Sequence, residues 1–188
     1  LEGDPHQIVE AAIVSAYAID ADAAYIFLRW AYHLAAERLR AAIARARRSQ
    51  AYVGVLFVDL DGFKSVNDTL GHRTGDMLLV EVAERMKTAV REDDTVARLG
   101  GDEFALVLNE MHDRAAVSEL AERVLAILQI TLGAGAETLQ VSGSIGVAVY
   151  PDDGESVSLL LEKADQAMYQ AKKAGKNRFT FYEAEGDA

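Results

Sequence analysis

One uninterrupted apolar segment, residues 52–58, limits most strongly what this chain can fold into. It reads Tyr52-Val-Gly-Val-Leu-Phe-Val58 and is followed directly by Asp59-Leu60-Asp61. A short apolar run without alternation is typical of a strand that is buried on both faces in the middle of a sheet. The segment therefore predicts a central strand whose acidic end emerges at the edge of the core.

The segments around this strand change between helical and extended patterns. Residues 8–49 contain neither Pro nor Gly and are rich in Ala, which predicts one long helix or two helices. Further helices are predicted over residues 63–70, 75–91, 115–132 and 156–173, strands over 95–99, 103–108, 138–150 and 178–182, and a loop over 133–137. This order predicts an α/β (α+β) sandwich with helices packed on a mainly antiparallel sheet.

Composition excludes several classes of protein. The 188 residues suffice for one domain with a full hydrophobic core, and the net charge of −11 argues against a general nucleic-acid binder. The absence of cysteine excludes disulfides, thiol nucleophiles and Cys-based zinc sites, and it fits a reducing compartment, so we expect a cytoplasmic domain. The longest uncharged run in the apolar N-terminal region, residues 11–19, is shorter than the roughly 20 residues of a membrane span, so none is expected.

Two acidic patches follow strands and are candidates for a metal site. The first is Asp59-Leu60-Asp61, and the second is Gly100-Gly101-Asp102-Glu103, where paired glycines predict a tight hairpin turn. Acidic groups at the ends of two strands can converge on Mg²⁺, which prefers oxygen ligands together with substrate phosphates. Each patch alone is better explained as a solvated strand end or a hairpin tip, and the metal site is favoured only when both patches are taken together.

Ordered motifs extend from the first patch through the second to the end of the last helix. They read Phe57-Val-Asp-Leu-Asp-Gly-Phe-Lys-Ser-Val-Asn-Asp-Thr-Leu-Gly-His72, Gly75-Asp76, Ala97-Arg-Leu-Gly-Gly-Asp-Glu-Phe104, Ser144-Ile-Gly-Val147, Ala164-Asp-Gln-Ala-Met-Tyr-Gln-Ala-Lys172 and Gly175-Lys-Asn-Arg178. Over residues 38–182 the chain closely resembles the GGDEF domain of bacterial diguanylate cyclases. The resemblance implies a nucleotidyl-cyclase, palm-like fold. It also implies condensation of two GTP into cyclic di-GMP and two pyrophosphates across a homodimer.

The resemblance implies a catalytic and metal-binding set at the two acidic patches. Asp59, Asp102 and Glu103 would be catalytic, and these residues with the Leu60 carbonyl would hold two Mg²⁺ or Mn²⁺ ions. Glu103 would serve as an additional ligand or assist deprotonation of the 3′-hydroxyl. Two such ions suit attack of a sugar hydroxyl on an α-phosphate, because they stabilise the attacking and the leaving oxygens.

The resemblance also implies how guanine is read. Asn67 and Asp76 would contact the base. Guanine offers neighbouring N1–H and N2–H₂ donors, which one carboxylate can accept together. Adenine lacks that pair, so ATP would leave Asp76 without its partners.

Basic residues are implied at the triphosphate. Phe63 and Lys64 would lie near it, and Lys172 and Lys176 would neutralise the β- and γ-phosphates. Lys176 stands where the family often has Arg, so its contact would be a point charge rather than a fork. A basic helix C-terminus that complements the helix dipole is the alternative explanation of these two lysines.

A regulatory motif precedes the glycine pair. Arg91-Glu-Asp-Asp94 matches the RxxD motif that forms the family's product-inhibition site. Arg91 would fork to a guanine or phosphate of cyclic di-GMP, and Asp94 would accept from a guanine edge. The alternative is a helix end with exposed charges.

The N-terminal part departs from the family. The Gly and Asn-Arg of the family's first loop are absent near residues 26–33, where Tyr25-Ile-Phe-Leu-Arg-Trp-Ala-Tyr-His33 favours an aromatic helix. Either a continuous helix replaces the loop, or the first 30 or so residues are foreign to the domain. We divide the chain into a helical segment over residues 1–37, a GGDEF domain over 38–183 and a tail over 184–188, and we expect an upstream sensor domain.

Two other functions fit the same residues. A GGDEF module without catalysis could bind GTP or cyclic di-GMP as a sensor, and the altered N-terminal loop favours this alternative. An N-terminal helix that merely dimerises, beside vestigial catalysis, is a weaker one. Metal-dependent release of pyrophosphate from GTP distinguishes an active cyclase from both.

Overall fold

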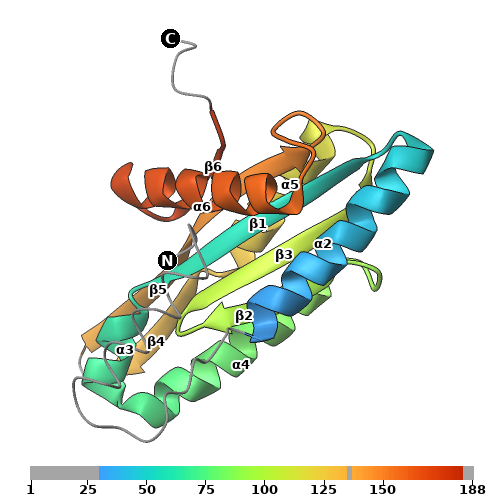
Figure 1. The fold of residues 1–188 in the computed structure, drawn as a ribbon. Helices are drawn as coiled ribbons and strands as arrows, with labels where there is room; N and C mark the ends of the chain where they lie inside the picture. Colours follow the sequence, from blue (N-terminus) through green and yellow to red (C-terminus); the bar gives the residue numbers. More distant parts are fainter. Residues whose placement is uncertain (1–29, 135–136, 184–188) are drawn as a thin grey trace, which may run out of the picture.

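The computed structural model describes residues 30–134 and 137–183, which form a mixed α/β fold (Figure 1). The elements are α2 (Trp30–Ser49), β1 (Tyr52–Asp61), α3 (Phe63–Leu70), α4 (His72–Ala89), β2 (Thr95–Gly100), β3 (Glu103–Met111), α5 (Arg114–Ile127), β4 (Ile130–Ala134), β5 (Glu137–Tyr150), α6 (Val157–Lys173) and β6 (Arg178–Phe181). Among these described helices, none has the length and apolarity needed to cross a membrane.

The sheet has β1 in its middle, as the apolar run predicts. The strand order is β2-β3-β1-β5-β4, and β6 pairs with β5. Only the β5–β6 pair is parallel among the described strands, so the predicted mainly antiparallel sheet flanked by helices is confirmed. Because β5 has 14 residues, its first part pairs with β4 and its second part pairs with both β1 and β6.

Side chains of β1 alternate between two hydrophobic cores. Leu56, Val58 and Leu60 pack in one core with α4 and α5. Val53, Val55 and Phe57 pack in the other with α2 and α6, the two helices in front of the sheet in Figure 1. Since successive side chains of a strand point to opposite faces, the odd-numbered acids of β1 continue the face that α2 and α6 cover.

The apolar stripe predicted for the first helix is confirmed in α2. Leu39, Ala42, Ile43 and Ala46 are all buried against the sheet. The helix begins at Trp30, so the last part of the unusual segment at residues 26–33 is helical. The prediction for residues 8–29 lies outside the described residues.

The predicted helix over residues 115–132 is too long, and the predicted order of elements omits a strand. α5 ends at Ile127 with Leu128 as its cap, and Ile130–Ala134 forms β4. β4 pairs antiparallel with β5, with Ile130 opposite Val141. The β-branched pair Ile130-Thr131 favours a strand, and Ile130 fills the core while Thr131 faces solvent, which is a period of two. Gly133, predicted in a loop, is therefore a strand residue.

Candidate active site at the end of β1

β1 carries Asp59 to a position where α6 supplies a cation. Lys172 lies in the last turn of α6, and its Nζ is 2.7 Å from Oδ2 of Asp59. The two side chains are 32% and 13% exposed respectively, so the ion pair is only partly solvated. Water screens such a pair less than one on the open surface. The fold thus joins a predicted metal ligand with a predicted phosphate-binding lysine.

The environment of Asp59 raises its pKa relative to that of an exposed aspartate. Burial is the largest cause and raises the pKa of Asp59 above 3.8. The hydrogen bond and charge of Lys172 lower this pKa, whereas the charges of Asp102 and Asp61 raise it. A second cation near Asp59 would therefore be stabilised by carboxylates that otherwise repel each other.

The second acidic patch lies beside the first because of strand register. β2 and β3 are joined by a turn with Gly100 at φ 152° and Gly101 at φ 55°. Glu103 is paired directly opposite Asp59, and the Leu60 amide donates to the Asp102 carbonyl at 3.2 Å. The predicted tight turn is confirmed, and it brings both acidic patches to one end of the sheet.

The helix pair α3–α4 brings the predicted base-reading residues together. A Cβ built on Gly75 would lie 2.0 Å from Oδ1 of Asn67 and 3.3 Å from Phe63. Only glycine therefore allows Asn67 to pack against the first turn of α4, directly beside Asp76. The side chains of Lys64 and Asp76 are exposed, as contact with a soluble nucleotide requires.

Asp61 is a residue whose role sequence reasoning missed. The acidic triplet suggested that it joins Asp59, but its carboxylate accepts from the hydroxyls of Ser142 and Ser144 at 3.0 and 2.9 Å. It also accepts from the backbone amide of Asn177 at 3.1 Å. A signal was present in the sequence, because residues 59 and 61 must share one face of a strand. Their different partners depend on β5 and on the turn after α6.

The donors at this end of the sheet fit a hard divalent cation. Asp59, Asp102 and Glu103 offer carboxylate oxygens, and Mg²⁺ needs only one or two of these when substrate phosphates complete its shell. Over residues 30–134 and 137–183, no group of three or more His, Cys, Asp or Glu side chains forms a ready-made metal cage. The donor set therefore suits a cation that arrives with a phosphate ligand.

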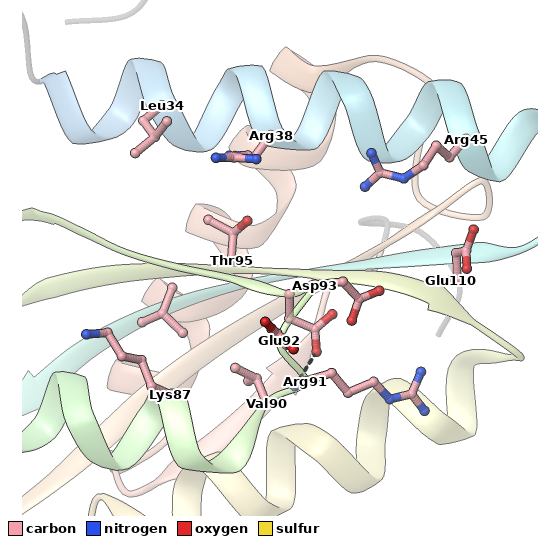
Figure 2. Close-up of a pocket in the computed structure, with 12 residues that line it drawn as sticks. Leu34, Arg38, Arg45, Lys87, Val90, Arg91, Glu92, Asp93, Thr95 and Glu110 are labelled. Carbon is pink, nitrogen blue, oxygen red and sulfur yellow. Dashed lines mark hydrogen bonds between the residues drawn. The ribbon is translucent and has the colours of Figure 1, made fainter.

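A second site lies between α2 and the turn that follows α4. It is a cavity of about 830 Å³. In Figure 2, Arg38 and Arg45 extend from α2 on one side, and Lys87 and Arg91 lie on the other. Sequence analysis predicted Arg91 and Asp94 here but missed the arginines of α2. The signal for Arg38 and Arg45 in the sequence was that both lie outside the apolar stripe of the first helix.

The acid of this second site closes the turn. Asp94 accepts from the backbone amide of Arg91 at 2.9 Å and from that of Asn109 at 2.8 Å. The Asn109 side chain is buried, accepts from Arg45 at 2.6 Å and donates to the Asp93 carbonyl. The structure thus brings Arg91 and Asp94 together and ties their turn to α2.

Comparison with known proteins places this arrangement in a family. The family model described as "Diguanylate cyclase, GGDEF domain" matches residues 33–178. The bifunctional diguanylate cyclase/cyclic di-GMP phosphodiesterase MucR of Pseudomonas aeruginosa is 45% identical over 152 residues. This match covers 81% of the chain but only 22% of MucR, so the chain spans less than a quarter of that relative.

Solved structures share the fold. The GGDEF domain of PA1120 (YfiN or TpbB) from Pseudomonas aeruginosa has a TM-score of 0.74 and 38% identity, with 80% of this chain and 94% of that chain covered. The GGDEF domain of DgcB from Caulobacter crescentus, solved in complex with c-di-GMP, has a TM-score of 0.65 and 28% identity. That likeness covers 79% of this chain and 88% of the DgcB chain.

Proposed function

Because the chain belongs to the GGDEF domain family, we propose that it is a diguanylate cyclase that condenses two GTP into cyclic di-GMP and two pyrophosphates. The observation that carries the proposal is the meeting of Asp59, Asp102 and Lys172 at one end of the sheet. Carboxylates that repel each other, with a cation beside them, suit a reaction in which phosphate charge must be neutralised. We assign the reaction to the cytoplasm, where GTP is available.

The phosphate end of GTP is assigned to the basic residues. Lys172 and Lys176 neutralise the β- and γ-phosphates, and Phe63 and Lys64 at the start of α3 lie beside the triphosphate. Gly62 supports the last assignment, because it precedes α3 at φ 85° and turns the chain sharply after β1. A point charge on a flexible stem, as in Lys176, contacts phosphate without fixing its orientation.

The guanine end is assigned to Asn67 and Asp76. The contact of Gly75 with Asn67 supports this role, since it sets the two polar side chains on neighbouring turns of α3 and α4. A carboxylate that accepts both N1–H and N2–H₂ selects guanine over adenine. We therefore expect GTP to be preferred strongly to ATP.

Asp59, the Leu60 carbonyl, Asp102 and Glu103 are assigned to two Mg²⁺ or Mn²⁺ ions. Such ions supply charge stabilisation at the attacking and leaving oxygens of the α-phosphate. Each 3′-oxygen forms a bond to the α-phosphorus of the other GTP as the bond from that phosphorus to pyrophosphate breaks. Glu103, opposite Asp59 in the sheet, accepts the hydroxyl proton in this proposal.

The product requires two copies of the chain. Cyclic di-GMP has a two-fold axis, and each domain holds one GTP, so a two-fold homodimer presents each 3′-hydroxyl to the other nucleotide. A monomer would bind GTP without completing the product. We propose that an upstream sensor domain controls this encounter, and that nucleic acid is not a partner.

The cavity between α2 and residues 91–94 is assigned to product inhibition. Arg91 and Asp94 bind cyclic di-GMP there, and Arg38 and Arg45 add positive charge from α2. Arginine suits this role because its planar fork matches both phosphate and the guanine edge. Occupation of this cavity by product would then join α2 to the turn at residues 91–94.

The proposal is tested by incubating the purified chain with GTP and Mg²⁺ and resolving the nucleotides by chromatography. Cyclic di-GMP and pyrophosphate should appear together, and ATP should give neither. The matched Asp59→Asn variant should bind GTP weakly and form no product. GTP binding without product from the unsubstituted dimer would contradict the enzyme and support the sensor alternative.

A further inference from the structure

Asp61 is a buried acid at the proposed active site that no step of the proposed reaction uses. It is 8% exposed, and its carboxylate accepts hydrogen bonds from three donors. Two of them are the hydroxyls of Ser142 and Ser144 on β5, and the third is the backbone amide of Asn177. The last contact reaches across the sheet to the turn between α6 and β6. A buried carboxylate with three such partners fixes these segments relative to each other.

The turn that Asp61 contacts begins as a regular helix ending. The Gly175 amide donates to the Lys172 carbonyl at 3.4 Å, and the Lys176 amide donates to the Ala171 carbonyl at 3.1 Å. This is the Schellman pattern, with Gly175 as the capping residue that its sequence position predicts. These two hydrogen bonds fix the path of the backbone only up to the amide of Lys176.

The backbone of Lys176 and Asn177, which follow the capping glycine, needs support from outside the helix. Lys176 has φ 63° and Asn177 has φ 47°, and this left-handed region is unfavourable for Lys, whereas Asn tolerates it better. Conformations of this kind persist where surrounding contacts hold them. Asp61 supplies such a contact from the end of β1, and β6 starts immediately afterwards, with Arg178 opposite Ser144.

We propose that Asp61 is a positioning residue: its carboxylate holds the turn after α6 so that Lys176 is presented to the β- and γ-phosphates of the nucleotide. This inference rests on the proposed function, which assigns Lys176 to those phosphates. Asp59 and Asp61 are two residues apart on one face of β1. The strand that pairs with Lys172 through Asp59 thus also holds Asn177, the residue after Lys176, through Asp61. One rigid strand thereby sets both lysines relative to each other.

The test measures binding of two nucleotides in the presence of Mg²⁺ by calorimetry. The first is 3′-deoxy-GTP, which lacks the attacking hydroxyl and cannot react, and the second is GMP, which lacks the β- and γ-phosphates. Asp61→Asn keeps the size of the side chain but replaces an acceptor oxygen by an N–H₂ group. It should weaken 3′-deoxy-GTP roughly five-fold, as for loss of one partly exposed charge contact. Binding of GMP should not change.

A double-mutant cycle separates positioning from a general defect. Lys176→Met should show the same pattern as Asp61→Asn, with weaker 3′-deoxy-GTP and unchanged GMP. In the Lys176→Met background, Asp61→Asn should cause little further loss, because both substitutions remove the same contact. Multiplying effects in the double variant, or equal losses for both nucleotides, would overturn the proposal.

The matched control weakens the same helix at its other end. Ser156 is the N-cap of α6, where its Oγ accepts from the Leu159 amide at 3.3 Å. Ser156→Ala should lower the thermal midpoint but leave the affinity for both nucleotides unchanged. A loss of affinity in this variant equal to that in Asp61→Asn would assign the effect to helix stability and overturn the positioning role.

A measurement on the unsubstituted chain covers the case in which Asp61→Asn does not fold. The Asn177 amide should exchange its proton slowly with solvent, although the residue is exposed, because Asp61 holds it. Exchange at the rate of a free amide would overturn the proposal, as would failure to bind 3′-deoxy-GTP. Absence of cyclic di-GMP from GTP, with 3′-deoxy-GTP still bound, would contradict only the proposed enzyme.

Discussion

The two charged regions of this molecule use their carboxylates in opposite ways. At the end of β1, Asp59 faces a side-chain cation, Lys172, and its pKa is raised chiefly by burial. In the turn after α4, Asp94 accepts from two backbone amides, those of Arg91 and Asn109. The first carboxylate pairs with a group that can move away, whereas the second is part of the backbone framework.

This difference separates a site that exchanges partners from one that presents a fixed surface. Lys172 has a flexible stem, and in the proposed reaction it would turn from Asp59 to a phosphate when another cation reaches the carboxylate. The bond of Asp94 with the partly buried Asn109 amide cannot open without weakening the satisfaction of that amide. An ionised carboxylate has about four acceptor sites, so Asp94 can still meet a ligand while it holds the turn. Arg91, whose side chain is exposed, is the nearby group that can adapt.

The largest expected effect comes from a substitution that disrupts only the acidic region at the end of β1. Asp102→Asn should lower turnover of GTP at least about 100- to 1000-fold, because it removes a carboxylate that we propose holds the cation that neutralises the reacting phosphate. Pyrophosphate release measures this loss, and circular dichroism should show the fold intact. Glu119→Gln, which changes an exposed acid on α5, should keep full activity. Turnover by Asp102→Asn near that of the control would remove Asp102 from the active site.

The next effect concerns the framework role of the second carboxylate. Asp94→Ala should lower the free energy of unfolding by about 1–3 kcal/mol, because two backbone amides lose their acceptor. Urea denaturation measures this change at constant slope. Asp93→Ala, which removes an exposed neighbouring side chain, should stay within about 0.5 kcal/mol. Equal stability of both variants would show that the turn does not need Asp94.

A smaller effect tests ligand binding at the same turn. Arg91→Gln should weaken binding of cyclic di-GMP about ten-fold, because a neutral amide cannot form the charged fork. Its stability should hardly change, since the Arg91 side chain is exposed. Calorimetry should find full affinity in Arg40→Gln, which removes an arginine of α2 outside the cavity. Unaltered binding by Arg91→Gln would place the product elsewhere.

The smallest expected effect is the contribution of the Asp59 pKa to stability, and it belongs to the acidic region at the end of β1. The folded chain binds a proton at Asp59 more tightly than the unfolded chain does, because burial raises this pKa. The resulting stability is full below 3.8 and is lost as pH rises through the raised pKa of the folded state. Lys172→Met removes the hydrogen bond and charge that lower this pKa, so the pKa of Asp59 should be higher still in this variant. NMR titration of the Asp59 carboxyl carbon checks both values, and a lower pKa in the variant would contradict the ion pair.

Local patterns in the sequence predicted most elements of the fold. The apolar run at residues 52–58 identified the central strand, and the stripe of Leu39, Ala42, Ile43 and Ala46 identified the buried face of α2. The same reasoning failed for residues 128–134, where an apolar segment after α5 forms β4. A short apolar segment fits either structure, and pairing with β5 decided between them.

The sequence also indicated part of the candidate site. Residue types at fixed spacing identified Asp59, Asp102 and Glu103, and the register of β1 with β3 brings them to one end of the sheet. The partners of Asp61, and the approach of Arg38 and Arg45 to residues 91–94, could not be predicted from local patterns. Nothing within a few residues of Asp61 indicates that it contacts a turn that lies more than a hundred residues later.

The sequence by itself determined the family, the central strand and the kinds of side chain available for chemistry. These follow from spacing and hydrophobic period, which are properties of neighbouring residues. Only the tertiary structure decided which acid is paired with a lysine, which one closes a turn and which one joins two segments. A side chain's partner depends on strand register and helix packing between distant parts of the chain, because hydrogen bonds and ion pairs act only over a few ångström.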